Sequence, residues 1–147
     1  MRGALAVAVL LGGCAVQTDY LDGSLVDLFD LGFTHTRVRL YDSELSVEYV
    51  DSARQEEVAL RVTVDNEGDL AEGDTYDLVA RGQVGWSDSF GSSLPDLESG
   101  ELRLSRYDEV DGEPVRGSFE AVFTSPDETR MSVLGGFSAE LEVVGAL

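Results

Sequence analysis

The sequence predicts an all-β fold, specifically an antiparallel β-sandwich of about seven or eight strands. Three features indicate this fold. Apolar and polar residues alternate with a period of two through most of the chain after Thr34, turns containing Gly, Asp or Pro separate the alternating runs, and no helical pattern of ordinary length is present. Because one-sided alternation also fits a single sheet that closes on itself, an up-and-down β-barrel is the alternative architecture.

The segment of residues 14–32 precedes the predicted β-domain and is interpreted as a tether followed by a docking segment. Ser24 stands just before Leu25 and Leu28, which predicts one short helix with Ser24 as its N-cap. An irregular segment that covers a sheet edge fits the same residues. The β-domain takes residues 33–147, and a chain of 147 residues is long enough for one such domain but not for two.

Residues 33–86 contain the first group of predicted strands. Residues 42–44 form a tight connection, whereas residues 51–57 and 65–74 form longer polar loops. Each strand has one apolar face for the core, and the polar residues in between, such as Arg37 and Glu48, are expected to face water. The residues expected on the apolar faces are Val38 and Leu40; Leu45, Val47 and Tyr49; Val58, Leu60, Val62 and Val64; Tyr76, Leu78 and Ala80; and Val84 with Trp86.

The C-terminal third has the most regular pattern. A strand through Leu102 and Leu104 leads to a hairpin turn at Asp111-Gly112. The motif Gly-x-Phe-x-Ala-x-apolar then occurs twice, in residues 117–123 and again in residues 135–141, which lie 18 positions later. The repeat predicts two neighbouring core strands in which the Phe rings of one lie over the Gly and Ala residues of the other.

The N-terminus has the order of an export signal. One charged residue, Arg2, precedes eight apolar residues at positions 4–11, which are too few to span a bilayer but enough for the apolar region of a signal peptide. The following Leu11-Gly12-Gly13-Cys14 resembles the lipobox of bacterial lipoproteins, and Cys14 is the only cysteine. The resemblance implies a signal peptide of residues 1–13, cleavage between Gly13 and Cys14, and acyl chains on the Cys14 thiol and on its freed amine.

The same resemblance implies an address in the cell envelope. Residue 15 is Ala rather than the Asp that retains such proteins at the inner membrane, so the outer membrane is favoured. The expected partner is the membrane, reached through the acyl chains. The alternative for Cys14 is a free thiol buried in the core.

The charge of the chain limits its partners. The formal net charge is −19, and all ten basic residues are Arg. Such a surface repels phosphate backbones, so we expect no nucleic-acid binding, and it repels anionic headgroups, so membrane attachment must rest on acyl chains rather than on a basic patch.

The sequence offers no convincing catalytic residue. His35 is the only histidine and is expected to be exposed on a strand. Gly85-Trp86-Ser87-Asp88-Ser89 lacks the final Gly of a nucleophile elbow, and one His without a free Cys does not suit zinc. A hydrolase with a carboxylate pair is the least favoured function, because acidic residues occur throughout the chain and no pair stands out. We therefore expect a non-enzymatic protein without a required cofactor.

Two ligand sites are alternatives to a purely structural role. The 65–74 loop carries closely spaced carboxylates that suit Ca²⁺, although it departs from the EF-hand pattern. Its candidate ligands are Asp65, Glu67, Asp69, Glu72 and Asp74. The second candidate is a carbohydrate site at Trp86 and Phe90 beside a Ser-rich loop, against which stands burial of the Trp86 indole in phase with Val84.

Overall fold

A single path of hydrogen-bonded strands builds the molecule, as a computed structural model shows for residues 19–86 and 94–145. The strand order is β5-β7-β8-β9-β2-β3-β4-β6, and β1 adds to the β9 edge. The strands are β1 (Tyr20–Asp22), β2 (His35–Leu40), β3 (Glu44–Asp51), β4 (Glu57–Asp65), β5 (Thr75–Asp77), β6 (Gly82–Trp86), β7 (Asp96–Arg106), β8 (Pro114–Thr124) and β9 (Arg130–Val143).

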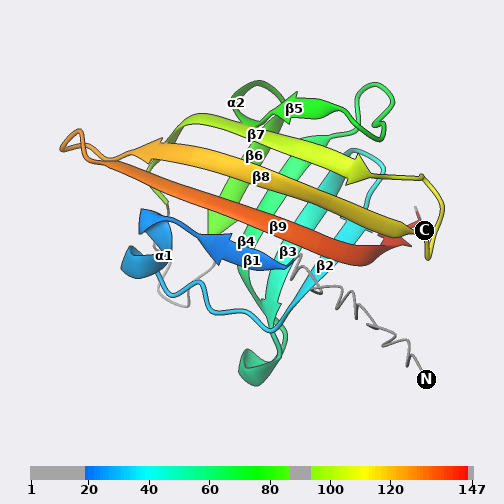
Figure 1. Cartoon of the computed structure of the whole chain (residues 1–147), viewed down its shortest axis with the longest axis horizontal. Helices are drawn as coiled ribbons and strands as arrows, with labels where there is room; N and C mark the ends of the chain where they lie inside the picture. Colours follow the sequence, from blue (N-terminus) through cyan, green and yellow to red (C-terminus); the bar gives the residue numbers. More distant parts are fainter. Residues whose placement is uncertain (1–18, 87–93, 146–147) are drawn as a thin grey trace, which may run out of the picture.

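The predicted all-β fold is confirmed. In Figure 1 the strands β7, β8, β9 and β1 form the front layer, and β2, β3, β4 and β6 lie behind them. The strand path joins the two layers through β9, so the sheet is nearly closed into a barrel and is closer to the barrel alternative than to two separate sheets.

The long strand β9 connects the two layers. It pairs with β8 from Arg130 to Glu140, while its other edge is shared by β1 and β2. The β1 pairing is antiparallel, with Tyr20 opposite Gly136, but the β2 pairing is parallel, with Val38 opposite Leu141. This parallel pair departs from the purely antiparallel sheet expected from the sequence.

The repeated Gly-x-Phe motif packs as predicted. Gly117 lies opposite Phe137, and Phe119 lies opposite Gly135. A Cβ atom at Gly117 would come within 2.5 Å of the Phe137 ring, and one at Gly135 within 2.6 Å of the Phe119 ring. Both rings are buried, so each glycine provides the space that the phenyl group of the neighbouring strand fills.

A short helix, α1 (Ser24–Leu28), forms where the sequence predicts one, but its predicted cap is wrong. The N-cap is Gly23, whose φ of 111° lies in the region that favours glycine. The Ser24 hydroxyl instead accepts a hydrogen bond from the Ser132 backbone N–H on β9 at 3.0 Å. Together with the fully buried Leu25, this bond fixes α1 against the sheet.

The predicted strand through Tyr76, Leu78 and Ala80 is also wrong after its first residues. The strand β5 ends at Asp77, and α2 (Leu78–Arg81) follows it. The Asp77 side chain accepts hydrogen bonds from the Val79 and Ala80 backbone N–H groups, which starts a helical turn. A second short helix, η1 (Ser52–Arg54), lies in the 51–57 loop. In the described part of the chain, no helix has the length and apolar character needed to cross a bilayer.

Candidate functional site

Some of the sequence-predicted site residues lie within the described ranges and others lie outside them. Gly13, Cys14 and Phe90 lie outside the described residues, so the lipid anchor and half of the proposed carbohydrate site remain predictions. The calcium-ligand candidates and Trp86 lie within the described ranges.

In the 65–74 loop, the Arg81 guanidinium binds Asp65, the first of the candidate calcium ligands. Arg81 donates two hydrogen bonds to Asp65 Oδ1, from Nη2 at 2.7 Å and from Nε at 3.1 Å, and its Nη2 also reaches the Glu67 carbonyl at 2.8 Å. The hydrogen bond from Arg81 holds the pKa of Asp65 below its ordinary value. Across residues 19–86 and 94–145, no three His, Cys, Asp or Glu residues gather as a metal site. The described geometry therefore does not support the Ca²⁺ hypothesis.

Trp86 is half-buried rather than fully enclosed in the core. Its ring meets Phe29 edge to face at a centroid distance of 4.7 Å, and its Nε1 donates to the Asp30 carbonyl at 3.4 Å. Trp86 also borders a hollow of about 340 Å³ at the β4–β6 edge. The described residues that line this hollow are Val58, Arg61, Gly85 and Trp86.

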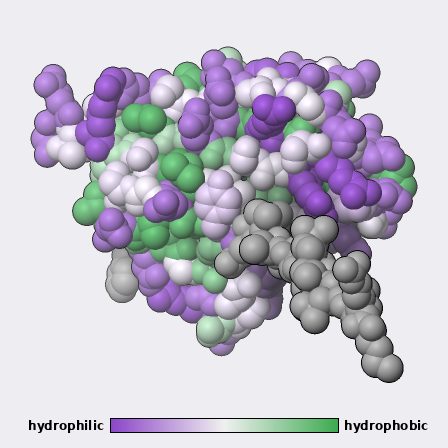
Figure 2. Space-filling model, in the orientation of Figure 1, coloured by the Kyte–Doolittle hydropathy of each residue, from purple (hydrophilic) through white to green (hydrophobic). Residues whose placement is uncertain are grey.

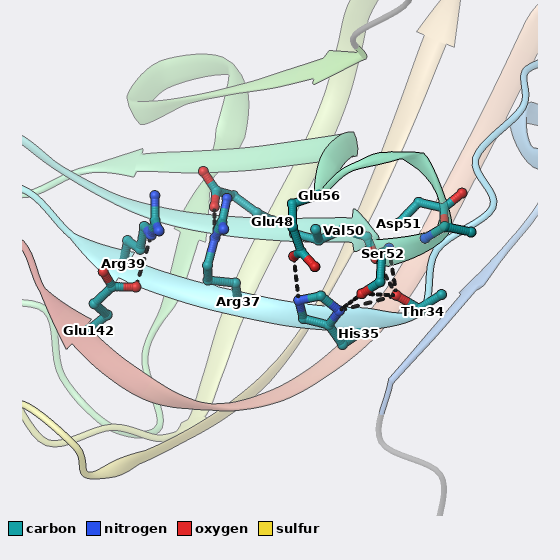
Figure 3. A network of polar contacts seen from close by, with 11 residues as sticks. Thr34, His35, Arg37, Arg39, Glu48, Val50, Asp51, Ser52, Glu56 and Glu142 are labelled. Atoms are coloured by element: carbon teal, nitrogen blue, oxygen red, sulfur yellow. Dashed lines mark hydrogen bonds and ion pairs between the residues drawn. The ribbon is translucent and has the colours of Figure 1, made fainter.

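The outer face of β2, β3 and β4 holds an ion network that the sequence pattern did not reveal. Glu48 has a side-chain exposure of 0% although it was expected to face water. Arg37 Nε donates to Glu48 Oε2 at 2.6 Å from one neighbouring strand, and Arg61 Nη2 donates to Oε1 at 2.9 Å from the other (Figure 3 shows Arg37 with Glu48). The two arginines cover the carboxylate and supply the charged hydrogen bonds that its burial requires.

The register of the sheet explains this burial. Arg37 and Arg61 are the direct cross-strand partners of Glu48, so three charged side chains lie in one row on one face. In the next row Arg39 pairs with Glu142 of β9 at 2.9 Å. Alternation correctly assigned these residues to the outer face, but only the pairing of β3 between β2 and β4 brings the charges together.

A second polar cluster lies where β2 begins and the β3–β4 connection ends. His35 Nδ1 is 3.1 Å from Thr34 Oγ1 and 3.2 Å from Ser52 Oγ, while His35 Nε2 is 3.4 Å from Glu56 Oε2 (Figure 3). Gln55 and Glu56 both have positive φ, 56° and 61°, a conformation that few non-glycine residues adopt. The imidazole thus contacts Ser52 and Glu56, the first and last residues of the connection, and Glu56 is one of the two residues with positive φ.

This chain of hydroxyl, imidazole and carboxylate could relay a proton, but its surroundings do not suit acyl transfer. A serine nucleophile needs free N–H donors for the oxyanion. The Ser52 N–H already donates to Thr34 Oγ1 at 2.9 Å, and the Ala53 N–H donates to Asp51 Oδ1 at 3.0 Å. His35 also retains a side-chain exposure of 42%, as expected for a surface strand residue. We therefore interpret the cluster as structural: it holds the β3–β4 connection against the start of β2.

Known proteins offer no guide to the role of these clusters. No protein-family model, no curated protein and no solved structure matches the chain.

Proposed function

We propose that the chain is a lipid-anchored protein of the cell envelope, attached through Cys14, whose β-domain acts by binding or by a structural role and not as an enzyme. The observation that carries this proposal is the sequence Leu11-Gly12-Gly13-Cys14 at the end of a short apolar segment. Since Ala15 follows the cysteine, the outer membrane is the proposed address.

The docking of β1 agrees with a short anchor. Asp19, the first described residue, accepts a hydrogen bond from the Ser138 N–H through Oδ1 at 2.6 Å, and β1 then pairs with β9. A fully extended chain from Cys14 to Asp19 spans at most about 18 Å. A lipid on Cys14 would therefore hold this side of the β-domain close to the bilayer.

The described polar clusters support a non-enzymatic role. The Glu48 carboxylate is shared between two arginines, and His35 contacts side chains that hold a connection in place. These interactions satisfy the groups that acid–base chemistry would otherwise use, and they stabilise the sheet instead.

Intact-mass analysis of the membrane-extracted protein tests the anchor, with Cys14→Ser as the control. The wild type is expected to begin at Cys14 and to carry the mass of a diacylglyceryl group and a further acyl chain. The Cys14→Ser variant is expected to keep its signal peptide and to carry no lipid. A wild-type chain that begins at Met1 without added mass would refute the proposal.

A binding role for carbohydrate is the second candidate, because the Trp86 hollow combines an aromatic ring with the Arg61 guanidinium. Trp86 is the only tryptophan, and it also borders a second hollow of about 420 Å³ beside Leu78 and Phe123, so its emission reports on ligands in either hollow. Titration with neutral and carboxylated oligosaccharides should shift or quench the emission if sugars stack there. Arg61→Met keeps the tryptophan and should weaken the response to the carboxylated sugars selectively. Unchanged emission with every sugar would argue against this candidate.

A further inference from the structure

The arginines of the described residues fall into two groups. Six of the nine form ion pairs with carboxylates, namely Arg37, Arg39, Arg54, Arg61, Arg81 and Arg130. The other three, Arg103, Arg106 and Arg116, form no ion pair with any residue in the described ranges. In a chain with a net charge of −19, acidic partners are abundant, so this grouping is unexpected.

The three arginines lie together on two neighbouring strands. Arg106 of β7 and Arg116 of β8 are direct cross-strand partners, and Arg103 lies opposite Ser118 in the same hairpin. All three are exposed on the outer face. Like charges placed directly opposite each other destabilise a sheet, so folding alone does not favour this arrangement.

The same outer face has other features of a surface that meets a membrane. Tyr20 and Leu134, on β1 and β9, are 41% and 38% exposed. Between Tyr20 and Arg103 the residues in the same row are small, Gly136 and Ser118, which leaves the sheet flat there, whereas Leu134 lies opposite Glu120. Tyrosine is enriched at membrane interfaces because its ring is apolar and its hydroxyl is polar. In Figure 1 the front strands β7, β8, β9 and β1 form this face, and Figure 2 shows it as a mixture of hydrophilic and pale side chains with hydrophobic ones.

Acidic side chains bound the arginine group at both ends. Glu101 and Glu120 lie opposite each other, two residue pairs from Arg103 and Ser118 and on the same face. At the other end, the exposed turn between Arg106 and Arg116 carries Asp108, Glu109, Asp111 and Glu113. The three arginines therefore form a narrow basic band between two acidic zones. At physiological ionic strength the Debye length is about 8 Å, so charges in direct contact with a surface outweigh most of the distant negative charge.

The predicted tether leaves the domain beside the arginines. Asp19 is hydrogen-bonded to Ser138, and Ser138 is the cross-strand partner of Arg116. With neighbouring strands about 4.8 Å apart, the Arg116 and Arg106 backbones lie only about 5 and 10 Å from that of Ser138. A lipid within about 18 Å of Asp19 would bring these arginines to the headgroup region.

We propose that the arginine face, defined as Arg103, Arg106 and Arg116 with Tyr20 and Leu134, contacts the phosphates of anionic lipid headgroups and sets the orientation of the domain on the membrane. The proposal rests on the lipid anchor proposed above, which supplies proximity. Arginine pairs with phosphate through a planar, bidentate fork, so three arginines suffice to orient a domain that acyl chains already hold in place. Under this proposal, acyl chains still attach the protein, as expected from the sequence, but the three arginines add a basic contact on the outer face of β7 and β8.

Arginine footprinting on vesicles tests this orientation in the full chain. Cys14, the only thiol, is coupled to a maleimide lipid in vesicles of phosphatidylcholine, alone or with about one-third phosphatidylglycerol. Phenylglyoxal modification of each arginine is then measured by mass spectrometry. On the anionic vesicles, modification of Arg103, Arg106 and Arg116 should fall roughly threefold or more, whereas that of Arg54 and Arg81 should not change.

A pair of matched variants separates the arginine face from overall charge. Ser118→Glu places an acid among the three arginines and should abolish their protection, while Thr129→Glu adds the same charge in an exposed turn and should leave it intact. Equal modification on both vesicle types, or equal protection on neutral vesicles, would overturn the proposal. Because the coupling is chemical, this result does not depend on natural lipidation, so failure of the anchor in the mass analysis remains a separate finding.

Discussion

The two halves of the sheet use arginine in different ways. On the outer face of β2–β3–β4, Arg37 and Arg61 surround the buried Glu48 and neutralise it. On the outer face of β7–β8, Arg106 and Arg116 face each other with no carboxylate in ion-pairing distance among the described residues. The first arrangement holds strands together, whereas the second leaves cationic groups exposed to solvent. The location of a charge on an outer face therefore does not reveal its role; the residue opposite it does.

The largest effect is expected from removing the centre of the paired group. Glu48→Ala should lower the free energy of unfolding by about 3 kcal/mol, because it leaves two arginines without their shared partner and a cavity beneath them. Glu48→Gln, which retains the shape and part of the hydrogen bonding, should cost less. Urea unfolding at neutral pH measures both variants. A loss below about 1 kcal/mol for Glu48→Ala would show that the network is not structural.

The second largest loss of stability is expected from disturbing the packing of Gly and Phe residues between β8 and β9. Gly117→Ala should cost about 2 kcal/mol, since its Cβ would lie 2.5 Å from the Phe137 ring in a closely packed core. Gly85→Ala is the matched control, because a Cβ there meets nothing within 4 Å, and it should be neutral or slightly stabilising. Thermal and urea denaturation compare the two. Similar losses at both positions would contradict the packing argument.

Replacing one arginine from each half of the sheet tests directly whether the two groups of arginines differ in their contribution to stability. Arg37→Ser should destabilise the protein by about 1–2 kcal/mol, since the buried Glu48 loses a charged hydrogen bond. Arg116→Ser should change stability by less than about 0.5 kcal/mol and can raise it, because it relieves repulsion with Arg106. Urea unfolding of the two variants at the same ionic strength provides the measurement. If Arg116→Ser were the more damaging change, the division into structural and exposed arginines would be wrong.

The smallest effect concerns the surface pair of Asp65 and Arg81. Because the pKa of Asp65 is lowered from about 3.8 in the folded state, the pair stabilises the fold above pH 3.8, and this contribution is lost as the pH falls through the lower folded-state pKa. Asp65→Asn should thus reduce the urea midpoint slightly at pH 6, and the difference from wild type should vanish at more acidic pH. Asp69→Asn, in the same loop, removes the same charge without disturbing Arg81. A difference for Asp65→Asn that persists at pH 2 would contradict this assignment.

The sequence predicted the features that depend on near neighbours in the chain. Period-two alternation identified most of the strands, although not β1 in the predicted docking segment, and the repeated Gly-x-Phe motif identified β8 and β9 as packed neighbours. The failures have local causes that alternation does not register. Asp77 caps a helical turn and ends β5, and Gly23 replaces Ser24 as the helix cap because Ser24 bonds to β9 instead.

The candidate sites were predicted less well, since each depends on residues far apart in sequence. Nothing near Asp65 in the sequence indicates that Arg81 binds it, and two of the three partners of His35, Ser52 and Glu56, lie 17 and 21 positions away. Trp86 was expected in the core, but Phe29 and Asp30, which come from the segment before the sheet, hold it at an edge.

By itself, the sequence determined most of the strands and which of their faces are apolar, because side-chain direction alternates along any extended chain. Only the tertiary structure decided that β9 pairs in parallel with β2, that Glu48 is buried between two arginines, and that three other arginines meet on β7 and β8. The physical reason is that strand order and register, which arise when the whole sheet assembles, determine which side chains become neighbours and so whether a charge is neutralised or left exposed.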